Sequence, residues 1–432
     1  MCVRKTADGG AARLAGLVAR ALIAPSLALV LSGCGVNLGS PPSDGSPSTS
    51  TLSTLNLDTI PTFYENGANN LLDLAQSIAV TGEPQAIRGS ISSADDVDVY
   101  DLGPMEPGDH IVVNITADDS LTGAMALFDD AGAALLINDH RNVYLGRYGP
   151  FIDVVIRRPS QSSFVAIAST PGYASTGDYV LTAVDEFPTP IPDPRPDVIL
   201  LDFAREKNLR IGSRPSIDVP AFDAADISSA YQGTTDEMTA RIVARVREDF
   251  VAYDVTIVST SEGAAYDGKM SRVHFGTFDP ALLGVAEGVD EFNAASAQEA
   301  IVFTDTFSAF MPLAPSVADM AQAVANVASH EIGHLLGLVH TNNADDLMDV
   351  TASLSELLLD QDFAKSPLYS AVFPLGNQDS VQSLLDSVGG DEELAHQKSR
   401  ERDRSRVQVR DRPWSPPARA SGMLSGCGLH GH

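Results

Sequence analysis

The sequence is poor in cysteine and in positive charge. Its 432 residues include three cysteines, Cys2, Cys34 and Cys427, whose wide spacing excludes a disulfide framework and a cysteine-based zinc site. Lysine and arginine total 28 against 57 aspartates and glutamates, so the net charge is −29. This charge argues against a phosphate-backbone partner, and we expect no nucleic acid ligand. Since 44% of the residues are hydrophobic, the chain must still bury a core, and its length allows about two or three domains.

Residues 1–33 have the pattern of a secretory leader. A basic stretch precedes the apolar run 22–31, which Pro25 interrupts and which is too short to span about 30 Å of hydrocarbon. The run closes in Leu31-Ser32-Gly33-Cys34, which resembles a bacterial lipobox and implies a lipid on the Cys34 thiol. Gly35 rather than aspartate follows, which implies the outer membrane. We therefore expect a lipoprotein that is secreted across the inner membrane and anchored by its lipid in the cell envelope.

Composition divides the rest of the chain. Serine, proline, threonine and glycine dominate residues 39–55, so residues 34–70 are expected to be the lipid anchor and a flexible tether. Proline recurs in residues 187–196, which predicts a semi-rigid linker. Residues 391–432 are polar and are predicted to be a disordered tail. Two folded domains are expected between these segments, over residues 71–186 and 197–390.

The first of these domains is predicted to be an all-β sandwich. Turn residues separate short alternating or apolar runs at intervals typical of that fold. The runs are 86–91, 97–102, 110–116, 124–128, 151–156, 163–169 and 178–184. The spacing of Asp95-Asp96-Val97-Asp98, Ala126 to Asp129 and Gly177-Asp178-Tyr179 resembles that of bacterial pre-peptidase C-terminal domains, which implies an accessory module. Asp95, Asp96 and Asp98 are either Ca²⁺ ligands or a solvated turn.

The second domain is predicted to be α/β. Strands are expected at residues 198–203, 255–259, 272–275 and 300–304, with an amphipathic helix at 236–251 between the first two. A further helix is indicated from Val317 to Leu336, where Gly337 ends it.

That last helix carries the residues that indicate chemistry. His330 and His334 are four positions apart, about 400° of helical rotation, so their imidazoles project from one face and suit one metal ion. Glu331 lies beside them, where a carboxylate can hold a water and take its proton as general base. A third ligand at His340 would lie about 240° further round a continuing helix. The helix must therefore stop, and Gly337 supplies the left-handed conformation for the turn.

The stretch from His330 to His340 resembles the metzincin signature, in which three histidines bind zinc and leave one position open for catalysis. Met348, eight residues after His340, corresponds to the Met-turn of the matrixin branch, which implies an apolar floor beneath the ligands. Asp349 and Val350 depart from the aromatic residue and proline that matrixins commonly carry next. The resemblance implies a twisted sheet whose edge strand binds extended peptide, and it selects residues 300–304 as that edge.

We therefore expect a multidomain chain, a β-sandwich followed by a metzincin-like catalytic domain, that hydrolyses peptide bonds of extracellular or envelope proteins. His330, His334 and His340 would bind zinc, Glu331 would act as general base on zinc-activated water, and Met348 would support the site. The acidic residues Asp279, Glu287, Asp290 and Glu291 are either structural Ca²⁺ ligands or a solvated loop. The alternative is an envelope-anchored binding or adhesion lipoprotein whose protease domain is vestigial.

Overall fold

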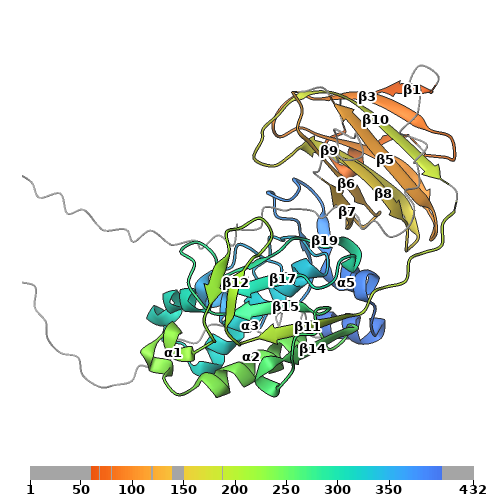
Figure 1. Ribbon diagram of the computed structural model, residues 1–432. Helices are drawn as coiled ribbons and strands as arrows, with labels where there is room; N and C mark the ends of the chain where they lie inside the picture. The colour runs from red at the N-terminus through yellow and green to blue at the C-terminus, as the bar shows by residue number, and fades with distance from the viewer. Residues whose placement is uncertain are drawn as a thin grey trace, which may run out of the picture.

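The computed structural model describes residues 60–67, 69–78, 80–117, 120–138, 150–186 and 188–400. The leader, Cys34 with its expected lipid, residues 34–59 of the tether and residues 401–432 of the tail lie outside the described residues. The described chain forms a β-sandwich followed by an α/β part (Figure 1). The predicted fold class is therefore confirmed. Within these ranges no helix combines the length and apolar character needed to cross a bilayer.

Two five-stranded sheets form the sandwich, and six of the eight pairs of neighbouring strands are antiparallel. The distal sheet has the order β1 (Thr62–Tyr64), β3 (Gln85–Ile91), β10 (Gly177–Glu186), β5 (His110–Ala117), β8 (Phe151–Val155). The proximal sheet has the order β2 (Gln76–Ser77), β4 (Val97–Met105), β9 (Ser160–Ser169), β6 (Gly123–Phe128), β7 (Ala134–Asn138). The sandwich begins at β1, before the expected residue 71, because β1 pairs with β3 in the distal sheet. β2 likewise adds a short parallel strand to the proximal sheet.

The proximal sheet is apolar on both faces. In β6, Met125 and Leu127 face the sandwich core, while Ala124, Ala126 and Phe128 point the other way and are equally buried. That second face packs against the α/β part, on Val339 and Phe373 among others. The rings of Phe128 and Phe373 lie 5.9 Å apart. The two parts therefore share a hydrophobic interface, and the proximal sheet has no solvent face there.

A five-stranded sheet organises the α/β part. Its order is β14 (Val255–Ser259), β11 (Asp197–Asp202), β15 (Ser271–Phe275), β17 (Glu299–Val302), β16 (Gly284–Ala286). The first four strands are parallel and β16 is antiparallel. Helices α2 (Thr235–Asp249) and α3 (Val317–Leu335) pack against each other in the main core with side chains of one sheet face. A smaller apolar cluster joins the other face to the hairpin of β12 (Glu206–Leu209) and β13 (Ile217–Val219).

The prediction that residues 300–304 form the edge strand is wrong. β17 lies between β15 and β16, and Ala300, Ile301 and Val302 are fully buried. The edge is β16, which the sequence did not indicate because it is only three residues long and begins with a glycine. The buried apolar run marked a central strand rather than an edge.

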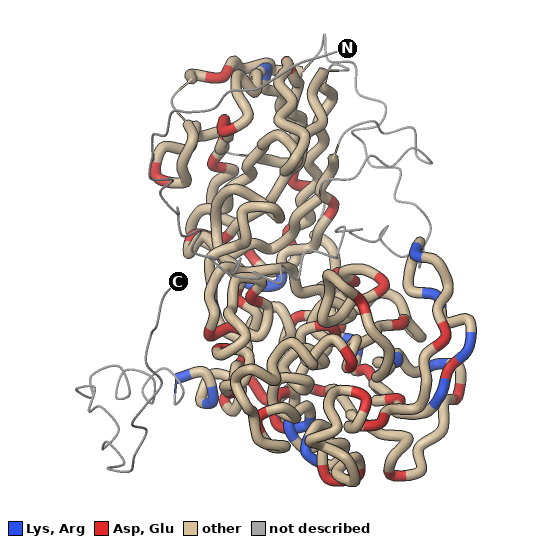
Figure 2. The backbone as a smooth tube through the Cα atoms, turned by 90° about the vertical axis from the view of Figure 1, so that its left-hand side faces the viewer, with Lys and Arg blue, Asp and Glu red and all other residues tan. Residues whose placement is uncertain are grey.

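Residues 391–432 were predicted to be disordered, and this is wrong for their first part, because residues 392–400 are helical. Leu394 and Ala395 pack on the main core, and Asp391 N donates to Ala252 O over 2.8 Å. Packing on the core therefore stabilises this short helix, as tertiary contacts do for most short helices. Figure 2 shows that acidic residues are spread over both parts of the molecule while basic residues are fewer.

Short elements complete the described chain. They are η3 (Leu72–Leu74), α1 (Ala224–Ile227), η5 (Ser229–Tyr231), η6 (Thr260–Glu262), η7 (Glu291–Asn293), η8 (Thr304–Leu313), α4 (Leu354–Leu357), β18 (Lys365–Pro367), β19 (Asn377–Asp379) and α5 (Ser380–Val388). Of these, η7 and the β18–β19 hairpin flank the turn that follows α3.

Asp98 lies inside the sandwich rather than in a solvated turn. It is 1% exposed, and the Tyr179 hydroxyl donates to its Oδ2 over 2.6 Å. The hydroxyl oxygens of Tyr100 and Tyr179 are also 2.6 Å apart, so the two tyrosines and the carboxyl form one buried network. Burial raises the pKa of Asp98 to about 7, against the lowering effect of the Tyr179 hydrogen bond.

This network predicts that the stability of the sandwich depends on pH. The folded state binds the Asp98 proton more tightly than the unfolded state, for which the reference pKa is 3.8. The contribution of Asp98 to the unfolding free energy is therefore greatest below pH 3.8. It decreases as the pH rises through about 7, and the total decrease is roughly 1–4 kcal/mol. Asp98→Asn imitates the protonated side chain and should reduce this dependence, as measured by urea unfolding between pH 4 and 8. Asp95→Asn, at an exposed position, is the control. An unchanged pH profile in Asp98→Asn would contradict the assignment.

Candidate metal centre

The long helix α3 carries the first half of the site. Ser316 caps its N-terminus and forms a capping box with Asp319, in which each side chain bonds the backbone N–H of the other residue. The helix then runs for 19 residues, and everything from Met320 onward is buried. His330, Glu331 and His334 therefore project from a rigid, buried helix, in the arrangement that the sequence predicted.

The chain reverses directly after α3. Gly337 has φ +100°, a conformation that favours glycine, and its N–H donates to His334 O while Leu338 N donates to Gly333 O. A Cβ at Gly337 would lie 2.9 Å from the carbonyl oxygen of Asp290. The turn therefore needs glycine for its backbone conformation and for its close approach to η7. It returns the chain so that His340 faces the two histidines of the helix.

The imidazoles of His330, His334 and His340 converge through their Nε2 atoms. The Nε2 of His334 lies 3.1 Å from that of His330 and 3.0 Å from that of His340. The Nδ1 of His330 faces Leu347 O at 2.6 Å, and the Nδ1 of His334 faces Leu338 O at 2.8 Å. Because carbonyl oxygens only accept, each of these Nδ1 atoms carries the proton and each Nε2 presents a lone pair.

The Nε2 lone pairs of His330 and His334 face each other at 3.1 Å and repel unless a cation lies beside them, so the donor set fits a metal ion. Burial keeps the imidazoles in the neutral form that binds metals. It lowers the pKa of His330 to about 3, lowers that of His334, and lowers that of His340 well below its usual value. Among the described residues, these three histidines form the group of histidine, cysteine and acidic side chains whose donor atoms lie within 4.8 Å of one another. The site suits zinc, which favours imidazole ligands in a tetrahedral arrangement.

Met348 lies beneath the histidines, where the sequence predicted it. It is fully buried, and a Cβ at Gly333 would lie 2.5 Å from its Sδ. Gly333, between the two helical histidines, therefore allows the thioether to pack directly on the backbone of α3. The sulfur contributes an apolar floor.

The loop after His340 is built by two aspartates that sequence reasoning did not assign. Asp346 is fully buried, accepts from Met348 N and the Thr341 hydroxyl, and has a pKa raised by burial to about 6. Asp349 accepts from the backbone of Asn343 and Thr351. Asp349 therefore ties both ends of this loop together. In the sequence, the only sign that Asp349 belongs to the site was its position directly after Met348.

Glu331 lies between the helix and the edge of the sheet. It is 2% exposed, and a Cβ at Gly284 on β16 would collide with its Oε1. Gly284 therefore makes room for the carboxylate beside the edge strand. In the sequence this glycine looked like any other, because its role depends on a neighbour 47 positions away.

Three of the acidic residues considered for calcium have other partners in the structure. Asp290 accepts from the backbone N–H groups of Ala294 and Ala295, and Asp279 pairs with Arg214 at 3.2 Å. Asp96 accepts from Ser92. Cys34, the predicted lipidation site, lies outside the described residues.

Comparison with known proteins places the histidines within a recognised family segment. Residues 246–365 match the matrixin family of peptidases, a stretch that includes α3 and Met348. The resemblance to matrixins that the sequence indicated is thereby confirmed. No curated protein matches the chain.

Several solved structures are similar in part. Archaemetzincin from Methanopyrus kandleri is 16% identical over 39% of this chain and 89% of its own, with a TM-score of 0.23. Metalloproteinase-II from Bacteroides fragilis is 13% identical over 68% of this chain and 93% of its own, with a TM-score of 0.21. The pre-peptidase C-terminal domain of a Bacillus anthracis collagenase is 14% identical over 25% of this chain and 93% of its own, with a TM-score of 0.21.

The turn after α3 should not tolerate a side chain at Gly337. Gly337→Ala combines a left-handed backbone, which costs about 1–3 kcal/mol for other residues, with the contact to Asp290. Gly263→Ala is a matched control, since Gly263 has φ +90° and no atom within 4 Å of the added Cβ. We expect Gly337→Ala to lower the unfolding free energy by at least about 1 kcal/mol more than the control in urea titrations. Equal losses would show that the turn is not constrained by its packing.

Proposed function

We propose, on the premise that residues 246–365 match the matrixins, that this protein is a zinc-dependent endopeptidase acting on extracellular or envelope proteins. The observation that carries the proposal is the convergence of three neutral imidazole Nε2 atoms with a carboxylate beside them. In this proposal His330, His334 and His340 are the zinc ligands and Glu331 is the general base. Three protein ligands leave a fourth position open, which distinguishes a catalytic site from a structural one.

Each residue has a defined role in the reaction. Bound zinc would lower the pKa of a water molecule toward about 7 and polarise the scissile carbonyl. The Nδ1–H bonds of His330 and His334 hold their rings with Nε2 facing the metal position. The Glu331 carboxylate accepts the proton of the attacking water and delivers it to the leaving amine nitrogen. Gly284 keeps that carboxylate from being displaced by a side chain of the edge strand.

The edge strand β16 supports binding of an extended peptide. Leu283 O accepts from Phe303 N and Glu287 N donates to Glu299 O, so residues 283, 285 and 287 direct their backbone groups toward β17. The N–H and C=O groups of Gly284 and Ala286 consequently point toward the free edge. A substrate strand can pair with them, and at Gly284 it would lie beside Glu331. Recognition through the backbone fits an endopeptidase with an extended substrate.

The role of Glu331 is tested in the full-length protein with casein and a peptide library. Glu331→Gln keeps the size of the side chain but removes the base, so kcat/KM should fall by about 10²–10⁴-fold while zinc stays near one per chain. Glu237→Gln, on the exposed face of α2, is the matched control and should retain activity.

The outcomes separate the competing functions. Hydrolysis that a chelator and Glu331→Gln both abolish supports the peptidase. A parent protein that binds zinc but cleaves nothing in the library has a latent or highly selective site, and unchanged biological activity in the Glu331 variant favours the vestigial, adhesive alternative. A folded parent without zinc would refute the proposed metal site.

We also propose that the protein is a lipoprotein of the cell envelope, anchored through Cys34. Support comes from the leader and lipobox-like sequence of residues 1–34. The described β-sandwich and α/β part would then follow a tether that holds them away from the membrane. The pre-peptidase-like module would be accessory to catalysis.

Lipid anchoring predicts a simple change in fractionation. Cys34→Ser removes the thiol that receives the lipid, so the variant should leave the membrane fraction and the detergent phase in which the parent is found. Cys427→Ser changes a cysteine near the other end of the chain and should fractionate like the parent. Retention of Cys34→Ser in the membrane would contradict anchoring at this residue.

A further inference from the structure

Gln378 on β19 holds the backbone of the residue before His340. Its Oε1 accepts from Val339 N over 2.7 Å, and its Nε2 donates to Val339 O over 2.9 Å. Gln378 is 4% exposed, so these bonds form away from water. One side chain therefore satisfies both backbone groups of the last residue before the third histidine. The donor and acceptor roles also fit only this orientation of the amide.

The strand that carries Gln378 is seated on the β-sandwich. Asn377 N donates to Gly132 O over 2.9 Å, and Ala133 and Asn377 form an isolated bridge. A Cβ at Gly376 would collide with the ring of Phe128. The turn between β6 and β7 thus fixes this strand through its backbone. The sandwich therefore reaches Val339 in two ways, by direct apolar packing and through the strand that carries Gln378.

A second contact with the sandwich supports the start of the same turn. Asp290 N donates to His334 O over 3.0 Å, and the backbone of η7 lies against Gly337. Phe292, with φ +59°, packs against the sandwich core, and the Arg157 guanidinium lies 5.1 Å from the centre of its ring. The segment 337–339 is therefore held at both ends by elements that contact the sandwich.

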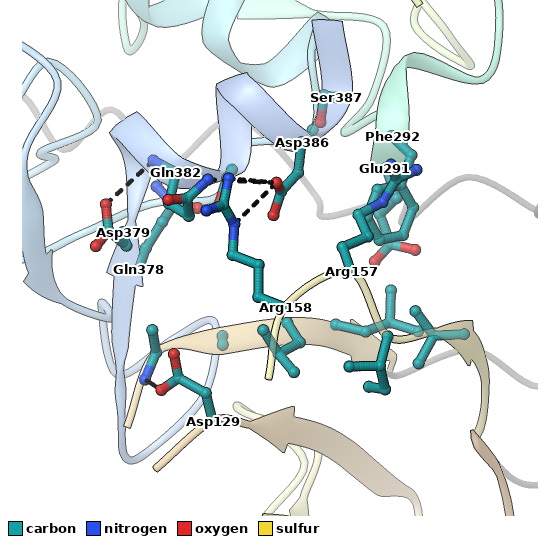
Figure 3. A pocket seen from close by; sticks show the side chains of 18 of the residues that line it. Asp129, Arg157, Arg158, Glu291, Phe292, Gln378, Asp379, Gln382, Asp386 and Ser387 are labelled. Atoms are coloured by element: carbon teal, nitrogen blue, oxygen red, sulfur yellow. Dashed lines mark hydrogen bonds and ion pairs between the residues drawn. The ribbon is translucent and has the colours of Figure 1, made fainter. Parts of the chain in front are cut away.

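The space behind this turn is not fully packed. A cavity of about 140 Å³ lies between the two parts, and Gly337, Val339, Gln378, Phe292 and Arg157 contribute to its wall. In Figure 3, Gln378 and Gln382 lie on one side of it and Arg158 reaches across from the sandwich to Asp386, with Nη2 3.1 Å from Oδ1. The side chain of Val339 packs in the apolar interface with Phe128 and Phe373, and the bonds of Gln378 hold its backbone N–H and C=O groups.

We propose that Gln378 is a positioning residue for His340, and that the β-sandwich, by seating β19, holds the third imidazole where the other two converge. The inference rests on the proposed zinc site. The accessory domain then contributes to metal affinity without touching the metal. Removing the bonds to Val339 leaves a buried N–H and C=O unpaired and lets the turn relax away from α3.

The test compares zinc affinities of full-length proteins. Gln378→Leu removes both bonds at similar side-chain volume and should weaken zinc binding by about 10–100-fold, the range typical of residues that orient metal ligands. Competition with a chromogenic chelator, well below the unfolding temperature, measures the dissociation constant. Gln382→Leu is the matched control, because Gln382 lines the same cavity and bonds Asp386 instead. Its affinity should equal that of the parent.

A second variant tests the contribution of the sandwich. Phe128→Ala removes the ring that packs on Gly376, while the sandwich core on the opposite face of β6 keeps its side chains. This variant should also weaken zinc binding, and it keeps the test open if Gln378→Leu does not fold. Replacement of zinc by cobalt adds a readout of ligand geometry, and the visible spectrum should change in both variants.

The results distinguish this inference from the proposed function. A parent that binds no zinc refutes both. A parent that binds zinc, together with variants at positions 378 and 128 of equal affinity and unchanged cobalt spectra, refutes the positioning role alone. Loss of affinity in both variants and retention in Gln382→Leu supports it.

Discussion

The structure around the histidines depends on a single reversal of the chain. Two imidazoles one helical turn apart can share a metal, but a third on the same helix would point away from them. The chain can bring His340 back only by leaving α3 abruptly, and it does so at Gly337, whose backbone conformation and close packing exclude a side chain. Neighbouring elements hold this turn in place. η7 contacts its start, Gln378 binds the backbone at its end, and Met348 packs beneath α3.

Much of this could be predicted from the sequence, because local spacing determines it. The predicted strand at 255–259 and the predicted helix at 236–251 lie within two residues of β14 and α2. Helical geometry sets the spacing of His330 and His334, and Gly337 marks the end of the helix that lets His340 return, so their convergence was expected before any coordinates. Met348 is also tied to them by a short distance along the chain.

The remaining features depend on residues that are distant in sequence. Gly284 matters only because Glu331 lies beside it, and Gln378 only because the chain brings β19 back to Val339. Neither has a local pattern that distinguishes it from other glycines and glutamines. The edge strand was misplaced for a related reason, since Ala300 to Val302 is a strong apolar run and β16 is short. A strong apolar run indicates a buried strand, and strands are most buried in the middle of a sheet.

The proximal sheet explains why the β region contains apolar runs as well as alternating ones. Ala124 to Phe128 is buried on both sides, one toward the sandwich core and one toward the α/β part. An accessory module joined only by a tether would need a polar outer face here. The interface therefore makes the two parts a single structural unit despite the proline-rich segment between them.

That shared face has a consequence for the order of synthesis. The strands of the proximal sheet are complete at Ser169, whereas Val339 and Phe373, which cover them, are translated some 170 residues or more later. At about 5–20 residues per second, the nascent chain carries an uncovered apolar sheet for roughly 10–40 s. Until the partner segment arrives, the apolar face is exposed to water and can associate with other chains.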